Sequence, residues 1–106
     1  MTPVTTQEFF VAGVQFRPGW HKMKPTVEHH EDAVVEIKHE LKNQYDEFAI
    51  KVFIDDQHVG YIPKPINRQI YDDHKAGLKA DCVLLLFQPD MKPYERYKVR
   101  VEMCQP

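Results

Sequence analysis

The sequence predicts a mainly β fold, a small antiparallel barrel or sandwich with one covering helix. About six segments alternate apolar and polar residues with the period of a half-buried strand. Residues 63–78 instead show the period of an amphipathic helix, and most connections are short. A closed barrel is favoured because closure removes unpaired strand edges. We therefore expect residues 1–106 to form a single domain.

The first predicted strand covers residues 8–16, in which every second residue from Phe10 to Phe16 shares one face. Two prolines and a glycine then break the alternation, and the chain continues through polar residues to residue 32. Residues 17–32 are therefore expected to form a loop of about 16 residues, a length at which loops are often functional.

The second and third predicted strands cover residues 33–41 and 48–54. Val35, Ile37 and Leu41 are expected to face inward from the second strand. The third strand continues through a tight hairpin turn into a returning strand. The turn occupies residues 55–57 and the returning strand residues 58–62.

The predicted helix within residues 63–78 has Pro65 near its start and Gly77 after its end. Two strands follow, at residues 79–87 and 95–103. The first of these is apolar enough to be buried on both faces, whereas the second is cleanly two-faced. Its inward residues are Tyr97, Val99, Val101 and Met103, and its outward residues are Arg96, Lys98, Arg100 and Glu102.

The charge and cysteine content limit the classes of function. The formal net charge is −2, so any nucleic-acid site has to be a local patch. No apolar run is long enough to span a membrane, and the N-terminus does not resemble a secretory signal. Cys82 and Cys104 form no C-x-x-C motif, so we expect reduced thiols within strands of an intracellular, cytoplasmic protein. The alternative is a single buried disulfide between them.

No set of catalytic residues, metal ligands or cofactor-binding residues is predicted. The chain has no serine and no glycine-rich phosphate loop. The pairs Asp55–Asp56 and Asp72–Asp73 are expected at a hairpin tip and on the polar face of the helix. His29 and His30 fall in a polar loop, and His39 falls on the inward face of its strand. We therefore expect no enzyme, metal ion or cofactor.

Aromatic and basic residues occur together near the ends of several predicted strands. Single-stranded nucleic acid binds to such surfaces because bases stack on rings and phosphates contact cations. The alternative is that the tyrosines are core-edge residues and the cations are solvated. The residues concerned are Arg17, Trp20, Tyr45, Tyr61, Lys64, Arg96, Lys98 and Arg100.

Three segments together resemble the HIRAN domain family: "VAGVQFR", "NQYDEFAIKVF" and "HVGYIPK". The resemblance runs from about Phe9 to Cys82 and is followed by the predicted helix. Its central motif is specific, with eight positions in register. These are Asn43, Tyr45, Asp46, Ala49, Ile50, Val52, Val59 and Gly60.

The resemblance implies an OB-like small β-barrel and a stand-alone member from a bacterium, phage or other mobile element. It also implies binding of single-stranded DNA at its 3′ end, alone or with a helicase or nuclease. By the family pattern, Tyr45 would stack on a terminal base and Asp46 would accept a hydrogen bond from the 3′ hydroxyl. Asn43 would contact the sugar–phosphate and Lys64 a phosphate. The backbone at Phe16 and Arg17 would line the same groove.

Two departures leave a second function open. DNA-binding members carry Arg-Tyr-Tyr where this chain has Gln15, Phe16 and Arg17, and proline where it has Gln44. Asn43 and Asp46 are also typical of Asx-type turns, which would give them a structural role. The alternative to DNA binding is a protein-interaction module on the same fold, such as a phage-encoded inhibitor of a host defence or repair enzyme.

Overall fold

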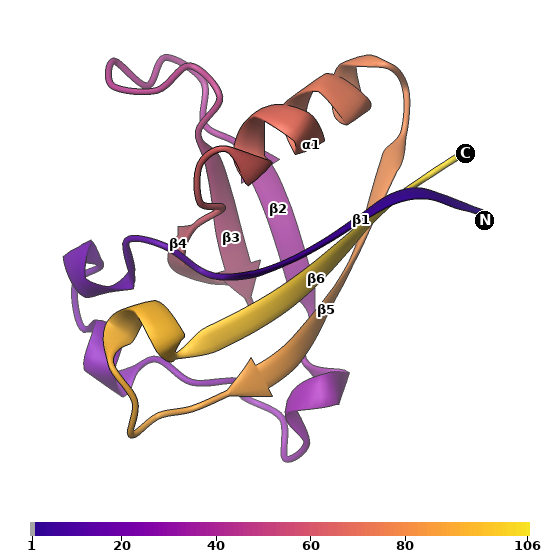
Figure 1. The fold of residues 1–106 in the computed structure, drawn as a ribbon. Helices are drawn as coiled ribbons and strands as arrows, with labels where there is room; N and C mark the ends of the chain where they lie inside the picture. Colours follow the sequence, from indigo (N-terminus) through magenta and orange to yellow (C-terminus); the bar gives the residue numbers. More distant parts are fainter. Residues whose placement is uncertain (1) are drawn as a thin grey trace.

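The computed structural model describes residues 2–106, which form six strands and one α-helix in two antiparallel three-stranded sheets (Figure 1). One sheet has the order β1-β6-β5 and the other the order β2-β3-β4. The elements are β1 (Pro3–Phe10), β2 (Val35–His39), β3 (Ile50–Ile54), β4 (Gln57–Tyr61), α1 (Ile66–Lys75), β5 (Lys79–Phe87) and β6 (Tyr97–Cys104). The predicted mainly β class is confirmed.

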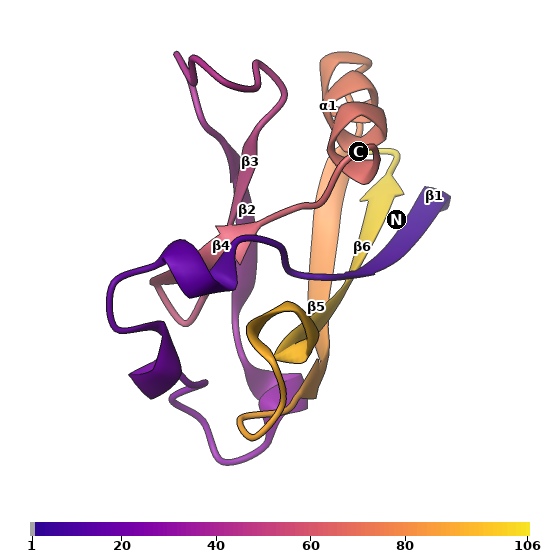
Figure 2. The same cartoon turned by 60° about the vertical axis from the view of Figure 1, so that its left-hand side comes forward.

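The two sheets are joined on one side only. After β1, the Ala12 amide donates to the Tyr61 carbonyl and the Tyr61 amide donates to the Ala12 carbonyl, both at 2.8 Å. On the other side, β2 and β5 are the outer strands of their sheets and form no ladder with each other in the described chain. Figure 2 shows the two sheets with α1 at one end. The arrangement is compatible with the predicted OB-like barrel, but the barrel is not closed.

The core lies between the two sheets. Every second residue of β6, from Tyr97 to Met103, is buried, as its alternation predicts. β3 contributes Val52 and Ile54 from the opposite sheet, and α1 adds Ile70. The apolar face of the helix therefore covers one end of the core.

The hairpin between β3 and β4 fixes part of the long loop. Asp55 and Asp56 both have positive φ, 48° and 65°, as required at the two central positions of a type I′ turn. The Asp55 carboxylate accepts hydrogen bonds from the amides of Thr26 (2.8 Å) and Val34 (2.9 Å). Burial alone would raise the pKa of Asp55, but these hydrogen bonds lower it below the ordinary value. The predicted structural role of Asp55 is thus confirmed.

The first strand was predicted too late in the chain. It begins at Pro3 and ends at Phe10, and Val14–Phe16 form a 3₁₀ turn rather than strand. Gly13 precedes this turn with φ 70°, a conformation that reverses the chain and suits glycine. Val14 is buried although it lies in this turn. The alternation of apolar and polar residues therefore extends beyond the end of the strand.

Three predicted orientations are also wrong. Leu41 is exposed, because β2 ends at His39 and the chain leaves the sheet before residue 41. β5 is largely exposed or half-buried rather than buried on both faces, because it is an edge strand. Arg96 does not face solvent, because the strand begins only at Tyr97 and the residue before it turns inward.

Within residues 2–106, no helix combines the length and apolar character needed to cross a membrane. Cys82 lies in β5 and Cys104 in β6, both as free thiols. Burial raises the pKa of Cys82 to about 12, so the thiol keeps its proton at neutral pH.

Candidate nucleic-acid interface

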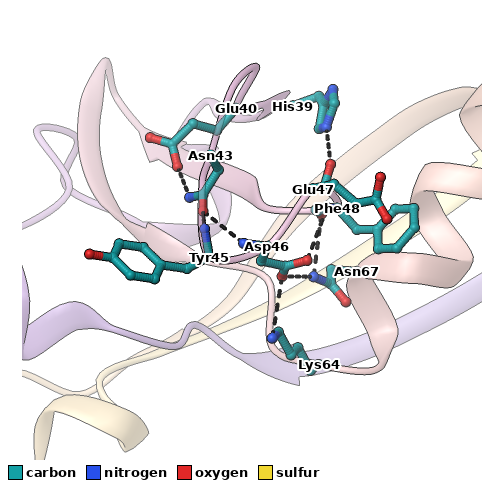
Figure 3. A network of polar contacts seen from close by, with 9 residues as sticks. All are labelled: His39, Glu40, Asn43, Tyr45, Asp46, Glu47, Phe48, Lys64 and Asn67. Carbon is teal, nitrogen blue, oxygen red and sulfur yellow. Dashed lines mark hydrogen bonds and ion pairs between the residues drawn. The ribbon is translucent and has the colours of Figure 1, made fainter.

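The corner between β2 and β3 is shaped by the side chain of Asn43 (Figure 3). Its Oδ1 accepts hydrogen bonds from the backbone amides of Tyr45 and Asp46, each at 2.8 Å. Its Nδ2 donates to the carboxylate of Glu40. These are the bonds of the Asx-type turn that the sequence predicts. Asn43 therefore holds the backbone on which the next two side chains are presented.

Asp46 is held from two sides. Its Oδ1 accepts from the Phe48 amide at 3.0 Å, and its Oδ2 accepts from Asn67 Nδ2 at 2.8 Å. Lys64 Nζ lies 3.9 Å from the same Oδ2. The side chain of Asp46 is 17% exposed. Because a carboxylate has about four acceptor positions, Asp46 can still accept a hydrogen bond from a hydroxyl in solvent.

Tyr45 is presented to solvent beside this carboxylate. The residue is 86% exposed, and Figure 3 shows its ring pointing away from the hydrogen-bonded network. Its backbone amide is bound to Asn43, so the ring projects from an ordered corner. A large aromatic ring in this position is available for stacking with a base.

Tyr61 is linked to the corner through Glu40. Its hydroxyl donates to the Glu40 carboxylate at 3.0 Å, and Lys51 Nζ lies 3.6 Å from the same carboxylate. Burial raises the pKa of Tyr61, and the neighbouring Glu40 charge raises it further. The hydrogen bonds from Asn43 and Tyr61 hold the pKa of Glu40 below its ordinary value despite its partial burial. Tyr61 therefore keeps its proton and positions Glu40.

Phe16 and Arg17 lie beside β4, brought there by the bridge between Ala12 and Tyr61. Phe16 is 80% exposed. Arg17 Nε donates to the His58 carbonyl at 3.1 Å, and the terminal nitrogens of Arg17 hydrogen-bond to nothing in the described residues. This guanidinium therefore remains able to contact a ligand phosphate.

The structure brings together some of the predicted residues and separates others. Asn43, Tyr45, Asp46 and Lys64 form one cluster. Tyr61 joins the cluster through Glu40.

The basic residues at the start of β6 belong elsewhere. Arg96 is 3% exposed and binds loop carbonyls. Lys98 pairs with Glu8 at 4.0 Å, and Arg100 pairs with Glu102 at 3.2 Å. Arg96 is buried, and Lys98 and Arg100 lie on β6 in the other sheet beside acidic side chains, so they do not extend the cluster at the β2–β3 corner.

Two residues of the site were missed from the sequence. Asn67 is 3% exposed, and its side-chain Nδ2 donates hydrogen bonds to the Asp46 carboxylate and to the Phe48 carbonyl. A signal was present, because Asn67 is a polar residue three positions before the buried Ile70 on the inward face of the helix. Glu40 gave no comparable signal, since its partners come from three separate segments.

Replacing Asn67 with alanine is expected to lower the free energy of unfolding by about 2 kcal/mol. The change removes a buried hydrogen-bond donor and leaves the Phe48 carbonyl and Asp46 Oδ2 with fewer partners. Urea denaturation measures the effect. The matched control is Gln69→Ala on the exposed side of the same helix, which should change the free energy of unfolding by less than about 0.5 kcal/mol.

Within residues 2–106, no metal-ligating group accompanies the cluster. In the part of the chain that the structure describes, no three histidine, cysteine or acidic side chains gather closely enough to hold a metal ion. The half-buried His39 instead places its Nε2 2.7 Å from the Glu47 carbonyl and its ring against Tyr71. The chemistry offered by the cluster is stacking, hydrogen bonding and charge pairing.

Comparisons with known proteins concern the family and the fold. The model of the HIRAN domain family matches residues 4–82. The crystal structure of the HIRAN domain of human HLTF is similar, with a TM-score of 0.67 and 17% sequence identity. The match covers 92% of this chain and 74% of that one. No curated protein sequence matches the chain. At this identity the structural likeness concerns the fold.

Proposed function

Because the chain belongs to the HIRAN domain family, which is known for DNA binding, we propose that it binds single-stranded DNA at the 3′-hydroxyl end. The protein acts as a non-catalytic module, either by masking DNA ends or by recruiting a helicase or nuclease to them. Such a role is exercised inside the cell, at the nucleoid in a bacterium.

The observation that carries the proposal is the pairing of Tyr45 with Asp46. An exposed ring stands next to a carboxylate that retains acceptor capacity, on a backbone held by Asn43. The terminal base stacks on Tyr45, and the 3′ hydroxyl donates to Asp46. Since stacking is tolerant of base identity, recognition is of the end and not of the sequence.

Two cations supply the phosphate contacts. Lys64 is largely exposed, and its 3.9 Å approach to Asp46 is loose enough for the ammonium to move to a phosphate. Arg17 has free terminal nitrogens beside β4, next to the exposed Phe16. Phe16 and Arg17 extend the binding surface away from the corner along the strand edge.

The first test compares two fluorescent oligodeoxynucleotides that differ only at the 3′ end, a hydroxyl or a phosphate, at low salt. We expect the 3′-hydroxyl form to bind at least about tenfold more tightly, because a terminal phosphate would be repelled by Asp46. Equal affinity for the two would contradict end recognition.

The Tyr45→Ala variant is expected to bind the 3′-hydroxyl oligonucleotide about tenfold more weakly, since base stacking contributes about 1–3 kcal/mol. Its thermal stability should stay unchanged, because the ring is exposed. Tyr94→Ala, an exposed tyrosine of the turn Pro93–Glu95, is the matched control and should bind more tightly than Tyr45→Ala. Normal binding by Tyr45→Ala would show that the ring is not a stacking platform.

A protein partner is the second candidate function. The net charge is −2, and the outward cations of β6 are paired with acidic neighbours. Both facts weaken attraction to a polyanion. If neither oligonucleotide binds at low salt, where phosphate contacts are strongest, a protein-interaction module such as an inhibitor of a host enzyme becomes the better proposal.

A further inference from the structure

A cavity of about 610 Å³ opens on the side where the barrel is not closed. Its walls come from β2 and the residues after it, from α1, and from the beginning of β5. We name it the β2–α1 groove. Its walls include Ile37, Leu41, Ile70, Tyr71, Lys79 and Ala80. The exposed Leu41 stands at this groove, an apolar side chain with no cover.

The groove runs along an unpaired strand edge. At the two ends of β2, the Glu40 amide donates to the Ala49 carbonyl and the Val34 carbonyl accepts from the Asp55 amide. The even-numbered residues of β2 therefore form hydrogen bonds to β3. By the alternation of an antiparallel ladder, the backbone groups of Val35, Ile37 and His39 point the other way. No strand among residues 2–106 pairs with that edge. β5 comes near this edge without pairing with it, and the cavity opens beside Ile37 and His39, so the edge can accept an added strand there.

The charge of the groove is opposite in sign to that of the whole chain. Three lysines line it, Lys38, Lys75 and Lys79, together with His39 and His74. Among the described residues that line it, none is an aspartate or glutamate. The chain as a whole carries a formal charge of −2. An apolar floor with a basic rim is complementary to an apolar segment that carries carboxylates.

We propose that the β2–α1 groove binds an extended acidic segment of a partner protein, which adds as a strand to the edge of β2. Alternate apolar side chains of the segment fill the cavity, and its carboxylates pair with the lysines. Backbone hydrogen bonds to Ile37 and His39 supply the remaining affinity.

The groove suits a peptide better than a nucleic acid. No arginine, phenylalanine or tryptophan lines it within the described chain, and Tyr71 is the one tyrosine that does. That ring is already packed edge-on against His39 and Phe48, with centroids 5.0 and 4.9 Å away. Lys75 Nζ lies 5.4 Å from the ring centroid. Tyr71 therefore offers no free ring face for base stacking, whereas the free edge of β2 remains.

The site is independent of the proposed DNA-binding corner. None of the residues proposed for DNA binding lines the β2–α1 groove. The Tyr45→Ala variant should consequently bind an acidic peptide as well as the unaltered protein does. A failure of the DNA proposal and a failure of the groove proposal can therefore be told apart.

The test is an NMR titration of the labelled protein with six-residue peptides that alternate glutamate and leucine. We expect shifts of the amides of Val35, Ile37 and His39 and slower hydrogen exchange at these positions. The same peptide with lysine in place of glutamate should not bind. The double charge reversal Lys38→Glu with Lys79→Glu should weaken binding at least about tenfold. Lys92→Glu, on an exposed loop elsewhere, is the matched control.

Three results would overturn the proposal. The first is no amide shift along β2 at millimolar peptide, and the second is equal binding of the lysine peptide. The third is displacement of the glutamate peptide by an oligodeoxynucleotide that shifts the same β2 amides in the Tyr45→Ala variant, which would assign the groove to nucleic acid.

Discussion

Replacing Arg96 with alanine is expected to lower the free energy of unfolding by about 3 kcal/mol. The guanidinium is buried and donates to the carbonyls of Met23 at 2.7 Å and Pro89 at 2.8 Å. Rings of Trp20 and Phe87 lie 5.7 and 5.1 Å from its central carbon. Removal takes a donor from the Met23 and Pro89 carbonyls and empties a space between aromatic rings. The Met23 carbonyl keeps one donor, the Tyr97 hydroxyl.

The same change is expected to loosen the long loop that follows β1. Arg96 bonds to this loop through the carbonyls of His21 and Met23, which places the residue just before β6 in contact with a segment more than 70 positions away. Urea denaturation measures the stability, and hydrogen exchange of the amides in residues 17–32 measures the loosening. Arg96→Lys should recover only part of the loss, because an ammonium cannot donate in several directions within one plane.

Lys98→Ala is the matched control for Arg96→Ala. Lys98 is the next cation along the chain, and its 4.0 Å approach to Glu8 is a surface contact. Such pairs contribute about 0.5 kcal/mol. If Arg96→Ala cost no more than this control, the buried guanidinium would not be what holds the loop to the barrel.

The Gly60→Ala variant is expected to lose about 3 kcal/mol of stability and to weaken DNA binding as well. An added Cβ would lie 2.4 Å from the Ala12 carbonyl oxygen and 2.6 Å from Val11 Cγ1. Both distances are far below van der Waals contact, and the first atom is backbone, so the bridge between Ala12 and Tyr61 has to open. That bridge is the connection that places Phe16 and Arg17 beside β4.

The Gly19→Ala variant is the control that separates the steric clash at position 60 from the general effect of replacing a glycine. Gly19 also has a positive φ, 69°, but no atom lies within 4 Å of an added Cβ. We expect a loss of about 1 kcal/mol from backbone strain alone. Thermal or urea denaturation of the two variants gives the comparison. Equal losses would mean that the contact with Ala12 is not what requires glycine at position 60.

Several parts of the fold were predictable from local pattern. The strand at residues 79–87 has the predicted bounds, and the inward face of β6 is the predicted one. The hairpin at Asp55 and Asp56 and the Asx turn at Asn43 follow from the conformational preferences of those residue types. Likewise, the motif around Tyr45 and Asp46 identifies the family, because it depends on residue identity and spacing alone.

The roles proposed for the corner residues remain predictions. The structure gives the positions of Tyr45, Asp46 and Lys64, and the titrations described above test what they bind. A structural role for Asn43 is compatible with a binding role for Tyr45, because the hydrogen bonds that form the turn also hold the backbone that carries the ring.

Most of the strands, the turn types and the family could be predicted from the sequence, since each depends on neighbours within a few residues. Which faces are buried and which edges remain free depends on contacts between distant segments. Arg96 is buried because a loop from the other end of the chain supplies carbonyls, and β5 is exposed because it lies at a sheet edge. The unpaired edge of β2 likewise arises from how the two sheets meet. Local periodicity carries no information about such long-range partners.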